Sequence, residues 1–168
     1  MKAVAKLIAT TEIENKTTLL KLCHYTHLTS QNSRRAARVR LGGYVILPRC
    51  LDKGRATLAG KNGEYHYACP LDQRFLEFVG INPEVLKKEL GKSDGEILEW
   101  IEKNAEHKRS DAEIAAWSEL AEKRVPTDVE SREFFNGIHK AAGPKREDIA
   151  TWFDVLDLDD YVTFGGKA

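Results

Sequence analysis

The stretch SDGEILEW, residues 93–100, decides the fold of this chain, because it combines a helix start with apolar side chains at helical spacing. Ser93 is followed three residues later by Glu96, which is the pattern of a capping box. In a capping box the Ser side chain accepts a hydrogen bond from the Glu backbone amide, and the Glu side chain accepts one from the Ser amide. The stretch SDAEIAAW, residues 110–117, repeats this pattern. Both stretches therefore predict helix starts.

Apolar side chains at helical spacing continue through most of the chain outside these two stretches. Each of the 3 tryptophans, Trp100, Trp117 and Trp152, stands three residues after an isoleucine, so that both side chains share one helix face. We interpret the three rings as anchors of a shared core. Pro70 and Gly80 are residue types of a helix start and a helix end. The sequence therefore predicts a mainly α-helical fold, a single compact domain of about six or seven helices.

A proline interrupts the apolar pattern of residues 35–60, RAARVRLGGYVILPRCLDKGRATLAG. Because proline lacks a backbone N–H and clashes with the preceding helical turn, Pro48 predicts a kinked helix or two helices that meet near Leu47. Residues 60–69 contain an Asn-Gly pair, which favours a short turn or a hairpin. Residues 1–28 are compatible with either a strand or a helix.

The composition is that of a soluble globular protein, with 42% hydrophobic and 31% charged residues. The 26 Lys and Arg balance the 26 Asp and Glu, which gives no general electrostatic reason to bind nucleic acid or an anionic membrane. No apolar run reaches the length of a membrane span, and the first residues lack the pattern of a signal peptide. The 3 cysteines form no framework spacing, which favours reduced thiols. We therefore expect a cytoplasmic protein with neither nucleic acid nor a membrane as its partner.

Three motifs resemble a bacterial family known as domain of unknown function 5069. They read RLGGYVILPR, LDKGRATLAGKNGEYHYACPLDQRFLEFVGI and WFDVLDLDD, and the resemblance covers roughly residues 34–160. It implies a small, mostly helical, cytoplasmic domain and supplies no activity, cofactor or catalytic residue. We therefore divide the chain into an N-terminal extension over 1–33, a helical domain over 34–160 and a C-terminal tail over 161–168.

The first candidate site is GEYHYACPLDQRF, residues 63–75. His66 can act as a general base or a metal ligand, because its pKa lies near neutral pH. Cys69 can act as a nucleophile or a second ligand, since it precedes the helix expected from Pro70, whose N-terminal amides lower a thiol pKa. Arg74 is a second source of positive charge. The alternative is that these side chains only pack the turn, which we favour because unpaired cysteines are commonly buried.

The second candidate site is PRCLDKGR, residues 48–55, which carries a run of basic side chains. We expect these residues to converge with the first site through the intervening turn and to bind a small anion. A set of Arg, Lys and Tyr side chains suits a carboxylate or a phosphate. The predicted ligand-binding residues are Arg49, Lys53, Arg55, Tyr65 and Arg74. The alternative is a solvated helix face with one weak ion pair.

Two charge runs stand far apart in the sequence: SRRAARVR, residues 33–40, and DVLDLDD, residues 154–160. We favour two solvated faces that attract each other over an arginine-lined phosphate site or a carboxylate site for a divalent cation. A zinc site can be assembled from two cysteines and two histidines (Cys23, His27, His66 and Cys69), but their spacing matches no established finger. We therefore predict no metal and no cofactor.

Two functional hypotheses remain open. The first is a binding or interaction module that recognises a small anion or a protein partner. The second is a small enzyme that uses His66 and Cys69 on an anionic substrate. We favour the binding module, because the sequence contains no recognised catalytic constellation and a helical core accounts for most of the special residues.

Overall fold

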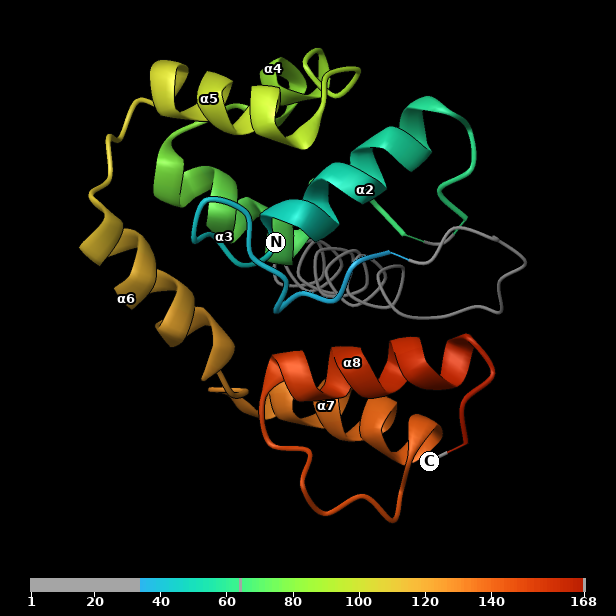
Figure 1. Ribbon diagram of the computed structural model, residues 1–168. Coiled ribbons are helices and arrows are strands. Elements are labelled where there is room, and N and C mark those ends of the chain that lie inside the picture. Colours follow the sequence, from blue (N-terminus) through green and yellow to red (C-terminus); the bar gives the residue numbers. More distant parts are fainter. Residues whose placement is uncertain (1–33, 64, 168) are drawn as a thin grey trace, which may run out of the picture.

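The computed structural model describes residues 34–63 and 65–167, and within them the chain is mainly α-helical, as the sequence predicts (Figure 1). The helices of these residues are α2 (Leu47–Leu58), α3 (Pro70–Val79), α4 (Pro83–Lys87), α5 (Asp94–Asn104), α6 (Asp111–Glu122), α7 (Val129–Ala142) and α8 (Trp152–Thr163). None of the described helices combines the length and the apolar character that crossing a membrane requires.

The helices form two groups joined by α6. Figure 1 shows α2, α3, α4 and α5 gathered on one side of the molecule, while α7 and α8 lie side by side on the other. Direct contacts join α2 to α3 within the first group and α7 to α8 within the second. The two groups face each other, and α6 runs along one edge from the first to the second.

The predicted capping boxes are confirmed at the starts of α5 and α6. The Ser93 hydroxyl accepts a hydrogen bond from the Glu96 amide, and the Glu96 carboxylate accepts one from the Ser93 amide at 2.8 Å. The start of α6 has the same arrangement. Two further boxes begin α7 and α8, formed by Asp128 with Ser131 and by Thr151 with Asp154. Local sequence therefore sets where four of the helices begin.

The prediction of helix on both sides of Pro48 is wrong. A single helix, α2, begins at Leu47 with the proline in its first turn, where the missing N–H has no helical partner to lose. The preceding segment is non-helical because Gly42, Gly43 and Ile46 have φ values of 57°, 82° and 70°. Positive φ is strained for a β-branched residue, and Ile46 holds it because its side chain is fully buried in the core.

The segment near 60–69 is the predicted turn rather than the alternative hairpin. It is closed by the Tyr65 amide donating to the Asn62 carbonyl at 3.0 Å, and no strand occurs among the described residues. The expected C-terminal tail began at residue 161, but α8 continues to Thr163. The tail is therefore shorter than predicted.

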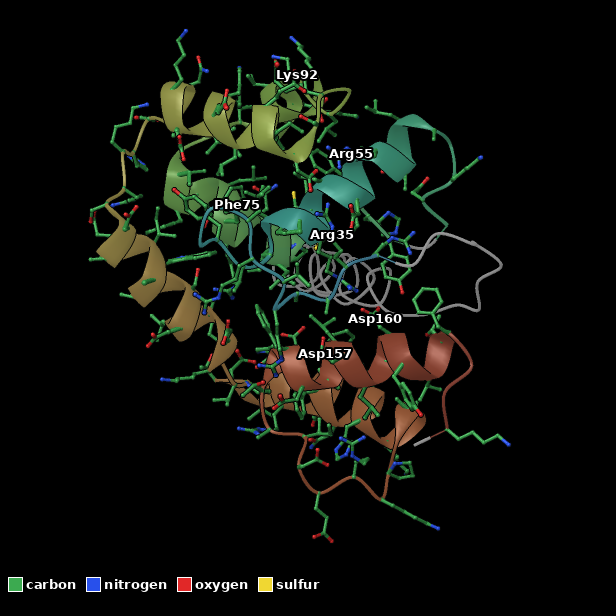
Figure 2. The ribbon with its side chains drawn as sticks, viewed as in Figure 1. Arg35, Arg55, Phe75, Lys92, Asp157 and Asp160 are labelled. Carbon is green, nitrogen blue, oxygen red and sulfur yellow. The ribbon has the colours of Figure 1, made fainter. Side chains whose placement is uncertain are left out.

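The buried side chains of the described residues form two clusters rather than one shared core. The larger cluster draws on α2, α3, α4, α5 and α6, contains the buried Phe75 (Figure 2), and also includes Phe153 of α8. Trp100 and Trp117 pack against this cluster. Trp152 packs instead against the smaller cluster between α7 and α8, so the prediction that all three tryptophans share one core is wrong. Burying a large apolar side chain contributes roughly 1.5–3 kcal/mol, so each helix group carries stabilisation of its own.

Candidate functional site

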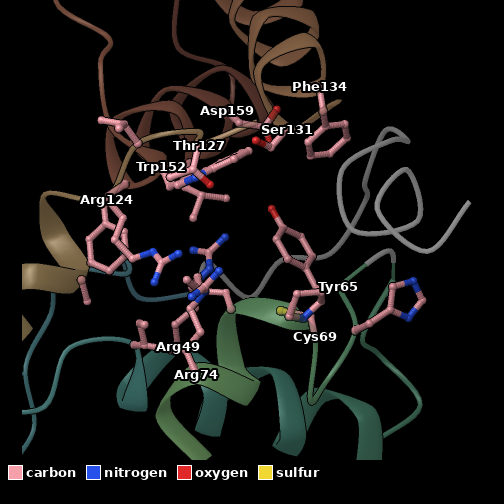
Figure 3. A pocket seen from close by; sticks show the side chains of 18 of the residues that line it. Arg49, Tyr65, Cys69, Arg74, Arg124, Thr127, Ser131, Phe134, Trp152 and Asp159 are labelled. Carbon is pink, nitrogen blue, oxygen red and sulfur yellow. The ribbon is translucent and has the colours of Figure 1, made fainter. Parts of the chain in front are cut away.

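A pocket of about 310 Å³ lies where α2 and α3 face the α7–α8 pair (Figure 3). Its lining comes from α2, the turn before α3, α3 itself, the segment between α6 and α7, and the α7–α8 pair. A volume of this size accommodates a small organic molecule. The pocket therefore draws on both helix groups and depends on how they face each other.

Six of the seven residues that the sequence singled out line this pocket: Arg49, Lys53, Tyr65, His66, Cys69 and Arg74. Arg55 lies outside the lining. Its guanidinium donates to the Asp94 carboxylate at 2.7 Å and to the backbone carbonyls of Leu90 and Lys92. Arg55 therefore fastens α2 to the start of α5 instead of facing a ligand.

Arg49 is held by the last turns of α8. Its Nη1 and Nη2 lie 2.5 and 2.9 Å from the two carboxylate oxygens of Asp160. The Tyr65 hydroxyl donates to the same carboxylate at 3.1 Å, and the Arg34 guanidinium stacks 3.3 Å from the centre of the Tyr65 ring. Burial and the negative charge of Asp160 raise the pKa of Tyr65 to about 12, so Tyr65 remains a neutral donor. These residues tie the turn before α3 to α8.

Lys53 contacts both a carboxylate and a thiol inside the molecule. Its ammonium lies 2.8 Å from Asp72 Oδ1 and donates to Cys69 Sγ at 3.0 Å. Lys53 is only 3% exposed and Asp72 is fully buried. Burial raises the pKa of Asp72 to about 7, although the Lys53 ammonium opposes the shift. Cys69 occupies the N-cap position of α3 and also lines the pocket. The cluster of Lys53, Asp72 and Cys69 is therefore adjacent to the pocket at the cysteine.

Arg74 and Arg124 line the pocket without a carboxylate partner among the described residues, and neither guanidinium donates a hydrogen bond there. Figure 3 shows both side chains converging with Arg49 inside the pocket. Burial and the nearby Arg124 charge lower the pKa of Arg74, while Glu77 opposes them. By contrast, seven other arginines form ion pairs: Arg35, Arg38, Arg40, Arg49, Arg55, Arg109 and Arg146. The pocket thus holds two neighbouring guanidiniums, of which Arg74 is exposed and Arg124 half-buried, that form no ion pair among the described residues.

The opposite wall of the pocket is largely apolar and aromatic. It is built from Phe134, Trp152, Phe153 and Leu156, which come from α7 and α8. Three acidic side chains also line the pocket, namely Asp128, Glu130 and Asp159. Asp128 is engaged in capping α7, where it accepts a hydrogen bond from the Ser131 amide at 2.7 Å. The site therefore combines a cationic side on α3 and the segment after α6 with an apolar side on α7 and α8.

The histidine predicted as a base does not meet the cysteine in a catalytic arrangement. His66 is exposed, and its ring makes no hydrogen bond within residues 34–63 and 65–167. Lys53, which the sequence analysis placed among the ligand-binding residues, contacts the sulfur instead. The buried Asp72 and the loop residue Arg124 were not identified from the sequence. A pattern signal existed only for Asp72, which stands three residues after the cap of α3.

The two charge runs attract each other, as the favoured interpretation expected. Arg38 donates to the Asp154 carboxylate and to Asp157 at 2.8 Å, while Arg49 pairs with Asp160. The carboxylates of α8 therefore serve as partners of arginines. No group of His, Cys, Asp or Glu suited to a metal ion occurs in the described part of the chain. Cys23 and His27 of the zinc hypothesis lie outside the described residues.

Comparison with known proteins places this chain in a family. A search of curated proteins finds no match. The family described as Domain of unknown function (DUF5069) matches residues 31–162, a span that contains every residue of the pocket lining described above. Because the match covers most of the chain, the protein belongs to the DUF5069 family.

Proposed function

We propose that this protein binds a small organic anion in the pocket between α3 and the α7–α8 pair. Arg74 and Arg124 hold the carboxylate or phosphate, and the aromatic wall covers the apolar part of the ligand. The observation that carries the proposal is the contrast between these two guanidiniums and the other arginines. Seven of the others form ion pairs, and the remaining two, Arg34 and Arg132, donate to backbone carbonyls. The side chains of Arg74 and Arg124 instead line the pocket with neither an ion pair nor a hydrogen bond among the described residues.

Two adjacent guanidiniums favour an anion for two reasons. Burial is the larger cause of the lowered pKa of Arg74, and repulsion from Arg124 is the second. A negative charge that binds between the two guanidiniums offsets this repulsion. Each charge-assisted hydrogen bond then contributes about 1.5–3 kcal/mol. The planar fork of a guanidinium also matches the oxygens of a carboxylate or phosphate in a bidentate way. Relief of the repulsion and the charge-assisted hydrogen bonds both favour anions over neutral ligands. Contact between the ligand and the apolar wall adds to the affinity.

Binding suits this site better than the enzyme hypothesis with His66 as a base. A general base needs a hydrogen-bond route to its nucleophile and a group that orients its ring. The His66 ring has neither among the described residues. A concave pocket also suits a small molecule more than a protein surface. From the composition we further propose a cytoplasmic location, with neither nucleic acid nor a membrane as partner.

The experiment compares charged probes with neutral analogues of the same shape. Phenylacetate is tested against phenylacetamide, and phenyl phosphate against phenol, by calorimetry and by the shift in Tm. We expect the anions to bind and to raise Tm, and the neutral analogues to do neither. Weakening of binding by rising salt provides an independent sign of charge recognition.

Variants assign the binding to the two arginines. We expect Arg74→Gln and Arg124→Gln each to weaken binding of the anionic probes about 10-fold or more, because each removes charge-assisted hydrogen bonds. Arg132→Gln is the matched control, since Arg132 is an exposed arginine of α7 outside the pocket lining. Unchanged affinity in the Arg74→Gln/Arg124→Gln double variant would refute the proposal.

A further inference from the structure

We propose that Cys69 is a nucleophilic thiol that exchanges with small disulfides carrying a carboxylate, with Lys53 stabilising the thiolate. The preference for an anionic disulfide rests on the proposed anion-binding function of Arg74 and Arg124. The nucleophilicity of the sulfur does not, because it depends on a different contact. The observations that carry it are the contact between Lys53 and Cys69, the burial of Lys53, and the position of the sulfur at the pocket.

The contact between Lys53 and Cys69 favours the ionised sulfur. The ammonium donates to Sγ at 3.0 Å, and an adjacent positive charge stabilises a thiolate relative to a thiol. Because Lys53 is almost entirely buried, solvent and salt screen this interaction weakly. Cys69 also occupies the N-cap position of the ten-residue helix α3, although its side chain makes no cap hydrogen bond, and the N-terminal partial charge of the helix has the same sign as the ammonium.

Asp72 and Cys69, the neighbours of Lys53, favour its charged form. Burial alone lowers the pKa of Lys53, but Asp72 and Cys69 reverse that effect and raise it above its usual range. The ammonium therefore persists at neutral pH while it contacts two acceptors, one of them the sulfur. A thiolate formed at Cys69 meets a cation that is already in place.

The pocket supplies a path for the second reactant. Cys69, Arg74 and Arg124 line the same cavity, so a molecule whose carboxylate meets the arginines can present another of its atoms to the sulfur. The apolar wall from α7 and α8 accommodates the carbon skeleton between the two ends. This arrangement raises the local concentration of an anionic disulfide at Cys69.

The chemical step is thiol–disulfide exchange. The Cys69 thiol loses its proton to water, and the thiolate attacks one sulfur of the disulfide. A new S–S bond forms at Sγ while the original S–S bond breaks, and the departing sulfur leaves with the electron pair and takes a proton from water. Cys69 ends in a mixed disulfide, and the other half of the reagent ends as a thiol. The disulfide itself is the oxidant.

Cys50 provides a control within the same molecule. Its side chain is fully buried and does not line the pocket. Burial raises the pKa of its thiol well above the usual range, which keeps it protonated and unreactive in the folded protein. Modification of Cys50 therefore reports unfolding, while modification of Cys69 reports chemistry at the pocket.

The test uses three disulfide reagents of different charge on the whole protein. They are the anionic 5,5′-dithiobis(2-nitrobenzoate), the neutral 2,2′-dithiodipyridine and the cationic cystamine, each compared with its rate toward glutathione. Peptide mapping locates the modified cysteine. We expect Cys69 to react faster than glutathione at pH 7, with the anionic reagent showing the largest advantage and with Cys50 unmodified. The rate of Cys69 should reach half of its plateau at a pH below the reference thiol value of about 8.5.

Variants separate the two parts of the proposal. Lys53→Met should slow all three reagents at Cys69 about 10-fold or more, because it removes the charge that stabilises the thiolate. If this variant does not fold, the pH midpoint in the unaltered protein tests the same point. Arg74→Gln and Arg124→Gln should slow only the anionic reagent, and Arg132→Gln should slow none.

The results that would overturn the inference are distinct from those that refute anion binding. If Cys69 reacts no faster than glutathione with any reagent, or if its midpoint lies at 8.5 or above, the thiol is not activated, even if phenylacetate still binds. If Cys69 reacts fast with all three reagents in the same order as glutathione, and the arginine variants change nothing, charge selection is refuted. The anion-binding proposal is then judged separately, by whether phenylacetate and phenyl phosphate bind and whether the arginine variants weaken that binding.

Discussion

Arg49 on α2 and Asp160 on α8 meet as a two-point ion pair, with Nη2 2.9 Å from Oδ1, although 111 residues separate them in the sequence. The Arg49 side chain is 4% exposed and that of Asp160 15%. The pair joins the two helix groups at the edge of the pocket, as the positions of α2 and α8 in Figure 1 indicate. Orientation of the groups, and with it the shape of the pocket, therefore depends on a buried polar contact.

Arg49→Ala is expected to destabilise the protein by about 3–5 kcal/mol, because it leaves the Asp160 carboxylate without its cation in a largely buried place. Chemical denaturation measures this change in the free energy of unfolding. Arg146→Ala is the control, since Arg146 pairs with Asp148 at an exposed place and its loss should change stability little. Equal effects of the two substitutions would show that the Arg49–Asp160 pair has no special structural role.

The raised pKa of Asp72 predicts that the contribution of this group to the stability of the protein increases as the pH falls below 7. The pKa of Asp72 is about 7 in the folded protein, because burial outweighs Lys53, against about 3.9 in an unfolded chain. Between about pH 3.9 and about pH 7 the carboxyl of Asp72 holds more protons in the folded state than in the unfolded state. Protonation of Asp72 therefore contributes fully to the stability of the folded protein below about pH 4, and this contribution is lost as the pH rises through about 7. The free energy of unfolding of the wild type, relative to that of Asp72→Asn, should therefore increase as the pH falls from 7 to 5. A flat difference over this range would contradict the raised pKa.

Gly42→Ala is expected to destabilise the segment before α2 by about 1–3 kcal/mol. The residue has φ 57°, and an added Cβ would lie 2.5 Å from a methyl carbon of Leu98. Gly95→Ala is the matched control, because Gly95 lies in α5 with open space around it. Alanine there should raise the free energy of unfolding by about 0.5–1 kcal/mol through helix propensity. Thermal denaturation of the two variants should give shifts of opposite sign.

Ser110→Ala should cost about 1 kcal/mol, because it removes the side-chain acceptor at the start of α6. Chemical denaturation gives the change. Ser110→Asp retains an acceptor and should restore most of the loss, since Asp is an equally good cap residue. A loss that persists in Ser110→Asp would point to a role of the hydroxyl other than capping.

The helix starts were predictable from the sequence because their signals are local. Ser93 and Glu96 satisfy each other's backbone amides within one turn, whatever the rest of the chain does. Pro48 misled the prediction, since the same residue fits a helix interior with a kink or a first turn. The choice depended on the positive φ of Ile46, which burial in the core imposes.

The candidate site was predictable only in part, because some of its contacts follow from local sequence and others depend on how distant helices pack. Lys53 and Cys69 are 16 residues apart with a turn between them, so their helices were expected to meet. That the lysine would be buried against the sulfur was not predictable, because lysine is rarely buried without a partner such as Asp72. Arg124 carries no local signal at all, and its approach to Arg74 depends on how α6 leads into the α7–α8 pair.

The pairing of Arg38 with α8 sets the order in which the molecule can be completed during synthesis. Arg38 is 119 residues from Asp157, so the ribosome makes this arginine long before its carboxylate partner. A nascent chain that ends before α8 has Arg38 without its carboxylate partners, and its larger apolar cluster lacks Phe153, so partly folded forms expose surface that the complete protein buries. The arrival of α8 supplies the carboxylate partners of Arg38 and closes one wall of the pocket, whereas Arg35 and Arg40 pair with carboxylates that precede α8.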